Sequence, residues 1–218
     1  MRRIRFYIYY LLRRWRRFAT AAFERWLLNQ LALESVEGIK IVDISQRREI
    51  DRRFHTDTVA ALHLVRSVDP RRFRRLQREI RYIVNNEAIP FASYDPVLKA
   101  CNVDYGRHEA TDNAEWYMWW YAATLVHEAT DGAIFSRYIE YTAKLRSRIE
   151  RLCHTEERRF ATRSDTPERR WSDALVGPFD EQVWHDSWNL TYFQRVRRQW
   201  TRFRESRRNA ARDKSKLQ

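Results

Sequence analysis

Glycine and proline are scarce in this sequence, which holds only four Gly and five Pro in 218 residues. An all-β fold needs many turns, and turns draw heavily on these two residue types. Long segments instead place apolar residues at steps of three and four, which is the spacing of one helix face. Because 44% of the residues are hydrophobic, the chain can also form a packed core. We therefore predict an α+β fold that is mainly α-helical.

Helices are expected wherever the three- and four-residue spacing persists, and Asp69 and Pro70 are typical of a helix start. Two shorter segments, "EGIKIVDIS" at 37–45 and "LKACNVDY" at 98–105, have the residue types of short strands. The helical pattern covers residues 3–33, 47–68, 69–87, 111–140 and 143–163, and a last helix is expected to start near Asp180. These boundaries predict three parts: an amphipathic basic helix at 1–36, a main domain at 37–180, and a C-terminal helix with a basic tail at 181–218.

The net charge of +13 is concentrated at the two ends of the sequence. Residues 1–17 contain seven Arg and no acidic residue, and residues 195–218 contain ten Arg or Lys and two acidic residues. The remaining residues, 18–194, are close to neutral, with a net charge of −2. Basic ends of this kind suit an anionic membrane surface or nucleic acid. The first helix can either dock on the domain or lie on an anionic membrane.

Cysteine content and hydropathy give an expectation for the cellular location. Two cysteines, Cys101 and Cys153, are too few for a disulfide framework and favour a reducing compartment. The apolar stretch "FYIYYLL" at 6–12 is far shorter than the roughly 20 residues of a membrane-spanning helix. We expect a cytoplasmic protein without a transmembrane helix, with peripheral membrane contact as an option.

The segment "TLVHEATDGAIFSR" at 124–137 carries the strongest chemical signal. On a helix, His127 and Asp131 lie one turn apart on the same face, so that both can reach one metal ion. Imidazole nitrogen and carboxylate oxygen are both accepted ligands of Zn²⁺. Glu128 corresponds to the Glu of a His-Glu-x-x-His helix, which takes a proton from the zinc-bound water. The pattern differs from that motif at Asp131, which stands where the second His is expected.

A catalytic zinc site needs a third protein ligand, and the segment 143–163 offers three candidates. Glu156 falls inside the apolar stripe of this predicted helix, where an ionised carboxylate is costly unless it is paired or bound to a metal. Glu157 lies off the centre of that stripe, and Cys153 lies one turn before Glu156. We favour Glu156 as the third ligand and keep Glu157 and Cys153 as alternatives.

The segment 124–137, followed by "RSRIERLCHTEERRF" at 146–160, resembles the zincin metallopeptidases of the gluzincin branch. More narrowly, it is similar to small bacterial proteins that carry His-Glu-Ala-Thr-His-Gly, and Gly132 matches the last residue of that motif. The resemblance covers roughly residues 55–163. It implies a zincin-like active-site helix with a short strand element, a zinc ion held by His127, residue 131 and a downstream Glu, and Glu128 as the base. It also implies a peptide or protein substrate.

These observations lead to two functional hypotheses from different classes. The first is a zinc-dependent metallopeptidase-like protein, or a degenerate relative that has lost activity because of Asp131. The second is a non-catalytic protein that binds an anionic membrane or nucleic acid through residues 1–17 and 195–218. Trp116 and Trp120 lie on the His127 face, where they can line a pocket or form part of the core.

Overall fold

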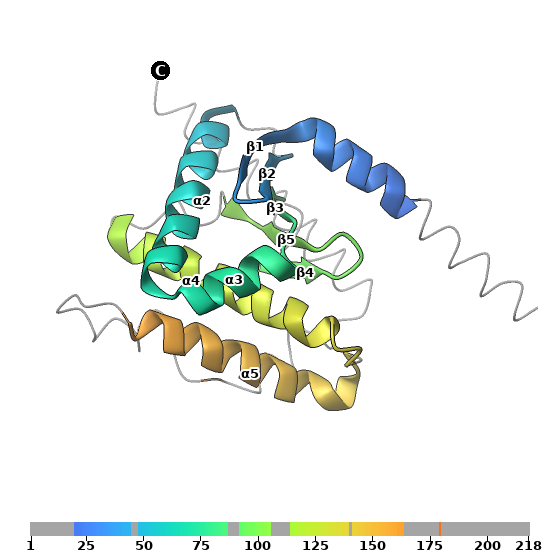
Figure 1. Cartoon of the computed structure of the whole chain (residues 1–218), viewed down its shortest axis with the longest axis vertical. Helices are drawn as coiled ribbons and strands as arrows, with labels where there is room; N and C mark the ends of the chain where they lie inside the picture. The colour runs from blue at the N-terminus through green and yellow to red at the C-terminus, as the bar shows by residue number, and fades with distance from the viewer. Residues whose placement is uncertain are drawn as a thin grey trace, which may run out of the picture. The chain divides into compact units, whose positions relative to one another are not determined.

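A mixed β-sheet lies at the centre of the fold in this computed structural model, which describes residues 20–44, 48–86, 92–105, 114–139, 141–163 and 179 (Figure 1). The chain divides into two compact units, Met1–Pro178 and Phe179–Gln218. Within the second unit the structure describes a single residue, Phe179. In the first unit the described strands are β1 (Ala32–Val36), β2 (Ile39–Asp43), β3 (Tyr82–Asn85), β4 (Ala92–Asp95) and β5 (Ala100–Val103). Their order in the sheet is β1–β2–β3–β5–β4. The α+β fold, mainly helical, agrees with the sequence-based prediction.

The three inner strands run parallel, and each outer strand runs antiparallel to its neighbour. β3 pairs in parallel with β2 on one side and with β5 on the other, while β1 and β4 are the antiparallel strands. A two-residue turn joins β1 to β2, and Gly38 adopts a φ of 89° there, a conformation that glycine enters without steric cost. The glycine therefore fixes a tight hairpin at the start of the predicted strand.

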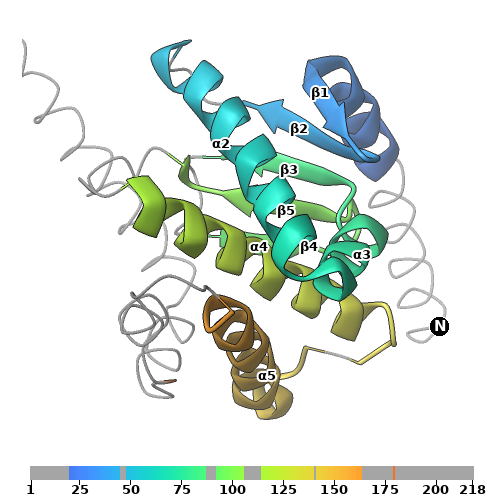
Figure 2. The ribbon, with the colours of Figure 1, turned by 60° about the vertical axis from the view of Figure 1, so that its left-hand side comes forward.

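The described helices that follow this hairpin are α2 (Arg48–Val68), α3 (Pro70–Glu79), α4 (Ala114–Phe135) and α5 (Ala143–Ala161). Asp69 caps α3 as the sequence predicts, because its side chain accepts hydrogen bonds from the backbone N–H groups of Arg71 and Arg72. Figure 2 shows α2 crossing one face of the sheet, with α4 near the β5–β4 side and α5 packed on the side of α4 away from the strands. α5 is thus an outer helix whose main partner is α4.

Side chains that alternate along the strands build a separate apolar cluster on each face of the sheet. On the face covered by α2, α3 and α4, the buried strand residues include Ile41, Ile83 and Cys101. On the opposite face, Val42, Tyr82 and Val84 pack with Leu28, which belongs to the helix of residues 20–31. The two clusters explain why β3 is buried at all four positions.

The helix of residues 20–31 is attached to the sheet by polar contacts as well as by Leu28. Asn29 accepts hydrogen bonds from the hydroxyl of Tyr82 at 2.9 Å and from Nζ of Lys40 at 2.8 Å. These contacts agree with docking of the predicted first helix on the domain, as far as residues 20–31 are concerned. Residues 3–19 of that predicted helix, the loop at 164–178 and the helix expected from Asp180 lie outside the described residues.

Several predicted boundaries are wrong, and most of the errors concern strands. One does not: the helix predicted at 111–140 ends earlier, because α4 stops at Phe135. The helix predicted at 69–87 ends at Glu79, and the central strand β3 follows within the same segment. The helix predicted to run to residue 33 stops at residue 31, because β1 begins at Ala32. The sequence pattern predicts no strand at β1 or β4. The sheet is therefore larger than the short strand element that the sequence indicated.

Candidate metal centre

The candidate site is built on α4, whose faces are directed by the packing of its apolar residues. Leu125, Val126 and Ala129 are buried in the main core. Because these residues turn one side of the helix inward, His127 and Asp131 share a different side, one turn apart. The predicted pair at 127 and 131 is therefore present on one helix, within Ala114–Phe135.

α5 supplies the residues that face His127. Glu150, Cys153 and Glu157 follow one another at steps of three and four, so they share one side of this helix. Nδ1 of His127 lies 3.0 Å from Oε2 of Glu157. Nε2 of the same ring lies 3.4 Å from Oε2 of Glu150. The imidazole is thus held between two carboxylates of the neighbouring helix.

The two carboxylates determine the protonation of His127. Burial alone would lower the pKa of this imidazole, but its hydrogen bonds with Glu150 and Glu157, and the negative charge of Glu157, raise it well above the usual value. At neutral pH the ring is therefore protonated in the metal-free protein, and both N–H groups can donate.

Glu128 lies in the same buried region, with 7% of its surface exposed. Burial raises its pKa to about 8; the positive charge of His127 opposes this, while the charges of Asp131, Glu150 and Glu157 add to it. A carboxyl group with a pKa near neutrality can both accept and return a proton. In the metal-free protein Glu128 is therefore largely protonated at neutral pH, and its predicted role as a base requires a neighbouring cation that lowers this pKa.

Asp131 is the least satisfied member of the group. Its Oδ1 atom is buried and has no hydrogen-bond partner among the described residues. Burial and the charge of Glu150 raise its pKa to about 7, and the charge of His127 works in the opposite direction. A buried carboxylate oxygen without a partner is costly, and a bound cation is one way to remove that cost.

The predicted third ligand, Glu156, is directed away from His127. Its Oε2 accepts hydrogen bonds from Arg72 at 3.1 Å and from Arg75 at 3.2 Å, and its Oε1 accepts one from Arg159 at 2.9 Å. Burial would raise the pKa of Glu156, but these arginines lower it. Because its carboxylate is already neutralised by arginines, we replace Glu156 by Glu157 in the candidate ligand set.

Cys153, the other alternative, lies among the acidic residues. Its thiol is buried, and burial raises its pKa far above the usual value, with Asp131 and Glu150 contributing through their negative charges. The thiol is therefore protonated, whereas a metal ligand must be the thiolate. Of the three third-ligand candidates, Glu157 has the most favourable contact with His127.

The residue types in this cluster are ones that bind zinc, but their donor atoms are not arranged around a common point in this structure. Among the described residues, no three His, Cys, Asp or Glu side chains have donors arranged as they would be around a metal ion. Both nitrogens of His127 face carboxylates instead. The cluster nevertheless combines an imidazole, several carboxylates and an orphaned oxygen at Asp131, which is a donor set that zinc accepts.

Glu150 is the site residue that sequence reasoning missed. It lies three residues before Cys153 and seven before Glu157, so the face that carries these two residues also carries Glu150. Its side chain is nearly buried. A search for acidic residues at helical spacing around Cys153, rather than along the apolar stripe, would have found it.

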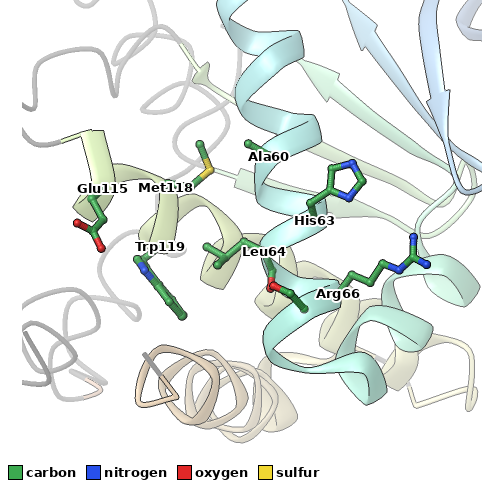
Figure 3. A pocket seen from close by; sticks show the side chains of 8 residues that line it. Ala60, His63, Leu64, Arg66, Glu115, Met118 and Trp119 are labelled. Carbon is green, nitrogen blue, oxygen red and sulfur yellow. The ribbon is translucent and has the colours of Figure 1, made fainter. Parts of the chain in front are cut away.

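A hollow in the described part of the chain lies elsewhere, between α2 and the first half of α4. Its volume is about 950 Å³, and it is open to solvent. Figure 3 labels seven of the residues that line it, Ala60, His63, Leu64 and Arg66 from α2 and Glu115, Met118 and Trp119 from α4; Ser67 of α2 lines it as well. The hollow includes none of the candidate ligands, so we do not assign the site there.

Two tryptophans on the His127 face and three further histidines of the sequence, His108, His154 and His185, are not assigned as ligands. Trp116 and Trp120 are half-buried and pack against the main core, which agrees with the expectation that they form part of the core. Burial lowers the pKa of His154, so this imidazole is neutral at physiological pH. His108 and His185 lie outside the described residues.

No family model, curated protein or solved structure matches this chain. The likeness to zincins therefore depends on the residues of the motif themselves. None of the described helices combines the length and the apolar character that crossing a membrane requires.

Proposed function

We propose that His127, Asp131 and Glu157 hold a zinc ion and that Glu128 acts as the general base of a zinc-dependent hydrolase. One observation carries the proposal: a buried cluster in which α4 and α5 bring an imidazole together with the carboxyl groups of Glu128, Asp131, Glu150 and Glu157. Like charges at such density are costly unless protons or a cation neutralise them.

Protons and zinc compete for the same groups in this proposal. In the metal-free protein the pKa values of His127, Glu128 and Asp131 are all raised, so protons provide the neutralisation. Zinc requires a neutral imidazole and ionised carboxylates, so binding releases protons and strengthens with rising pH.

Each residue has a separate role in the proposed reaction. A bound zinc ion polarises a substrate carbonyl and makes water acidic enough to react at neutral pH. Glu128 takes up the proton of the attacking water and returns it to the leaving group. Glu150, next to Nε2 of His127, holds the ring in one orientation, as second carboxylates do in other zinc sites.

The resemblance to zincins implies that the bond cleaved is a peptide bond. Asp131 replaces the histidine of that motif, and a carboxylate makes the site more negative. The proposal therefore includes both an active peptidase and a weakened relative. The variant Asp131→His separates the two, because a gain in zinc affinity or in peptide cleavage identifies the natural protein as the weakened form.

Metal binding by the full-length protein tests the proposal directly. Protein stripped with EDTA is titrated with Zn²⁺ by calorimetry and with Co²⁺, whose visible spectrum reports tetrahedral coordination. We expect the His127→Ala substitution to weaken binding by about 100-fold or more, because it removes a ligand. His63→Ala is the matched control, because His63 lies on the exposed side of α2. Equal binding by the two variants would refute the zinc site.

Catalysis requires a further comparison. Glu128→Gln should keep its zinc but lose zinc-dependent cleavage of an unstructured protein such as casein, since the amide cannot accept the proton. If wild-type protein binds zinc but has no more activity than Glu128→Gln, the site is a degenerate one.

The second candidate function is binding of an anionic membrane through the basic segment at 1–17, which lies outside the described residues. One observation favours it: in the helix of residues 20–31, Phe23 is 62% exposed and Trp26 is 56% exposed. Aromatic side chains beside basic residues are typical of helices at a membrane surface. Sedimentation with anionic vesicles should decrease with salt and after the double substitution of Phe23 and Trp26 by Ser. Vesicle binding that does not change with salt concentration would contradict a membrane-binding function.

A further inference from the structure

A second, independent feature is a groove bordered by arginines between α3, the end of α4 and α5. Its volume is about 370 Å³. Its arginines are Arg71, Arg74, Arg75, Arg78 and Arg137, and Glu156 is the acidic residue that lines it. We call this feature the arginine groove.

The spacing of the arginines on α3 makes the groove strongly basic. Arg71, Arg74, Arg75 and Arg78 follow the i, i+3, i+4, i+7 pattern and therefore share one side of the helix. From first to last they span about 10 Å along the axis. The opposite side of α3 is buried through Phe73 and Leu76, so the arginine side is held outward by core packing.

Three of these guanidinium groups have no ion pair with another described residue. They are those of Arg71, Arg74 and Arg137, which are all exposed. Arg78 contacts Glu79 through Nε at 2.6 Å. Arg75 is held in place by Thr130 at 2.9 Å and by Glu156 at 3.2 Å. The groove thus has one ordered arginine with several others whose charge is not balanced locally.

Glu156 shows what kind of group these arginines bind. Its carboxylate already receives hydrogen bonds from Arg72, Arg75 and Arg159. An oxyanion is therefore the natural ligand of the guanidinium groups on this side of α3. Arg78 is paired with Glu79 and Arg75 with Glu156, so the guanidinium groups of Arg71, Arg74 and Arg137 leave a surplus of positive charge, which a ligand with several negative charges in a small volume would balance.

We propose that the arginine groove binds a compact ligand with a phosphate or diphosphate group. Guanidinium forks match phosphate oxygens in pairs, which favours phosphate over a singly charged ion. The volume suits a small phosphorylated molecule. None of the described residues that line the groove is aromatic, so the groove offers no surface on which nucleic-acid bases could stack, and a single-stranded nucleic acid is the less suited partner.

Titration of the full-length protein with inorganic pyrophosphate tests this inference. The buffer contains EDTA, and the measurement is repeated with His127→Ala, so the result does not depend on the proposed zinc site. We expect Arg71→Gln and Arg74→Gln each to weaken pyrophosphate binding about tenfold, since each removes a charge-assisted contact. Neither side chain has an ion-pair partner among the residues that the structure describes, so we expect both variants to keep the wild-type melting temperature.

Two further variants sharpen the test. Arg148→Gln removes the same charge from an exposed position of α5 that does not line the groove, so it should leave affinity nearly unchanged. Glu156→Gln should strengthen binding, because it frees Arg75 for the ligand.

Two results would overturn the proposal. One is an equal loss of affinity in Arg74→Gln and Arg148→Gln, which would show general attraction by the net charge of the chain. The other is that pyrophosphate does not bind, whereas a short single-stranded oligonucleotide binds in a way that depends on Arg71 and Arg74. That result would assign the groove to a nucleic-acid backbone.

Discussion

Nδ1 of His127 and the carboxylate of Glu157 lie 3.0 Å apart, although 30 residues separate them in the sequence. The preceding residue, Glu156, points to the arginines of α3 instead. Adjacent residues on a helix differ by about 100° in direction, so one of the two reaches α4 and the other reaches α3. The ion pairs of Glu156 therefore help to fix the rotation of α5 that brings Glu157 to His127.

This arrangement predicts opposite effects for two neighbouring substitutions. Glu157→Gln should weaken zinc binding by about tenfold or more, because it removes a proposed ligand. Glu156→Gln should weaken zinc binding much less than Glu157→Gln, because it acts only through the rotation of α5. It should also lower thermal stability, because Arg72 is almost buried and loses a partner. Calorimetric titration with Zn²⁺ and thermal unfolding monitored by circular dichroism measure the two effects. Loss of zinc only in the Glu156 variant would reverse our assignment.

The raised pKa values predict how the stability of the metal-free protein depends on pH. Folding raises the pKa of Glu128 from 4.5 to about 8 and that of Asp131 from 3.8 to about 7, so the folded state binds more protons across those ranges. Stability therefore decreases as pH rises from about 5 to 8. The raised pKa of His127 acts in the same direction, because its ion pairs are lost when the ring deprotonates.

Glu128→Gln should remove part of this dependence, because an amide does not ionise. Between pH 5 and pH 8 the wild type should lose more unfolding free energy than the variant. The variant should therefore gain on the order of a few kcal/mol relative to the wild type over this range. Urea denaturation in EDTA measures it. Glu115→Gln, an exposed position of the same helix, is the control and should show no such trend. Added zinc should stabilise the wild type more at pH 8 than at pH 5.

Gly132 is predicted to be intolerant of even the smallest side chain. A Cβ atom at this position would lie 2.8 Å from Cζ of Tyr94 and 3.0 Å from Cβ of Glu79. The ring of Tyr94 is held by its hydrogen bond to the backbone oxygen of Glu79, so it cannot move freely. Gly132→Ala should cost about 1–3 kcal/mol through overpacking. Helix propensity alone predicts a gain of about 1 kcal/mol, so the sign of the change in urea denaturation decides between the two.

Both cysteines should be unreactive in the folded protein. Cys101 and Cys153 are fully buried, and burial raises both thiol pKa values, so little thiolate is available. Titration with a thiol-reactive disulfide should modify them only after unfolding in denaturant. Ser67→Cys, at an exposed position of α2, provides the positive control because it should react at once. Fast reaction of Cys153 would show that the packing of α5 on α4 opens readily, and fast reaction of Cys101 would show the same for strand β5.

Helices were easier to predict from this sequence than strands, and the reason is physical. α2 and α5 were predicted within a few residues, because each has one apolar side and one charged side. β3 is a short run, "YIVN", that is buried on both faces, so it has no polar alternation to distinguish it from the helix before it. Edge strands β1 and β4 have partly exposed, mixed sequences that carry little signal.

The sequence predicts which candidate site residues share a face of one helix, but not which residues of two different helices meet. The spacing of His127, Glu128 and Asp131 follows from helix geometry, which the sequence contains. The choice between Glu156 and Glu157 depends on how α5 is rotated against α4, and that rotation is fixed by tertiary ion pairs with arginines 84 and 81 residues away. No local pattern contains this information.

The position of β3 also has a consequence for the order of folding during synthesis on the ribosome. β1 and β2 can form their hairpin as soon as they emerge, but β3 takes its second neighbour from residues 100–103. Until those residues are available, one edge of the central strand has no partner, and exposed edges of this kind pair readily with other chains. A nascent chain that has released residue 86 but not residue 100 from the ribosome is therefore in a state in which its central strand can pair with other chains.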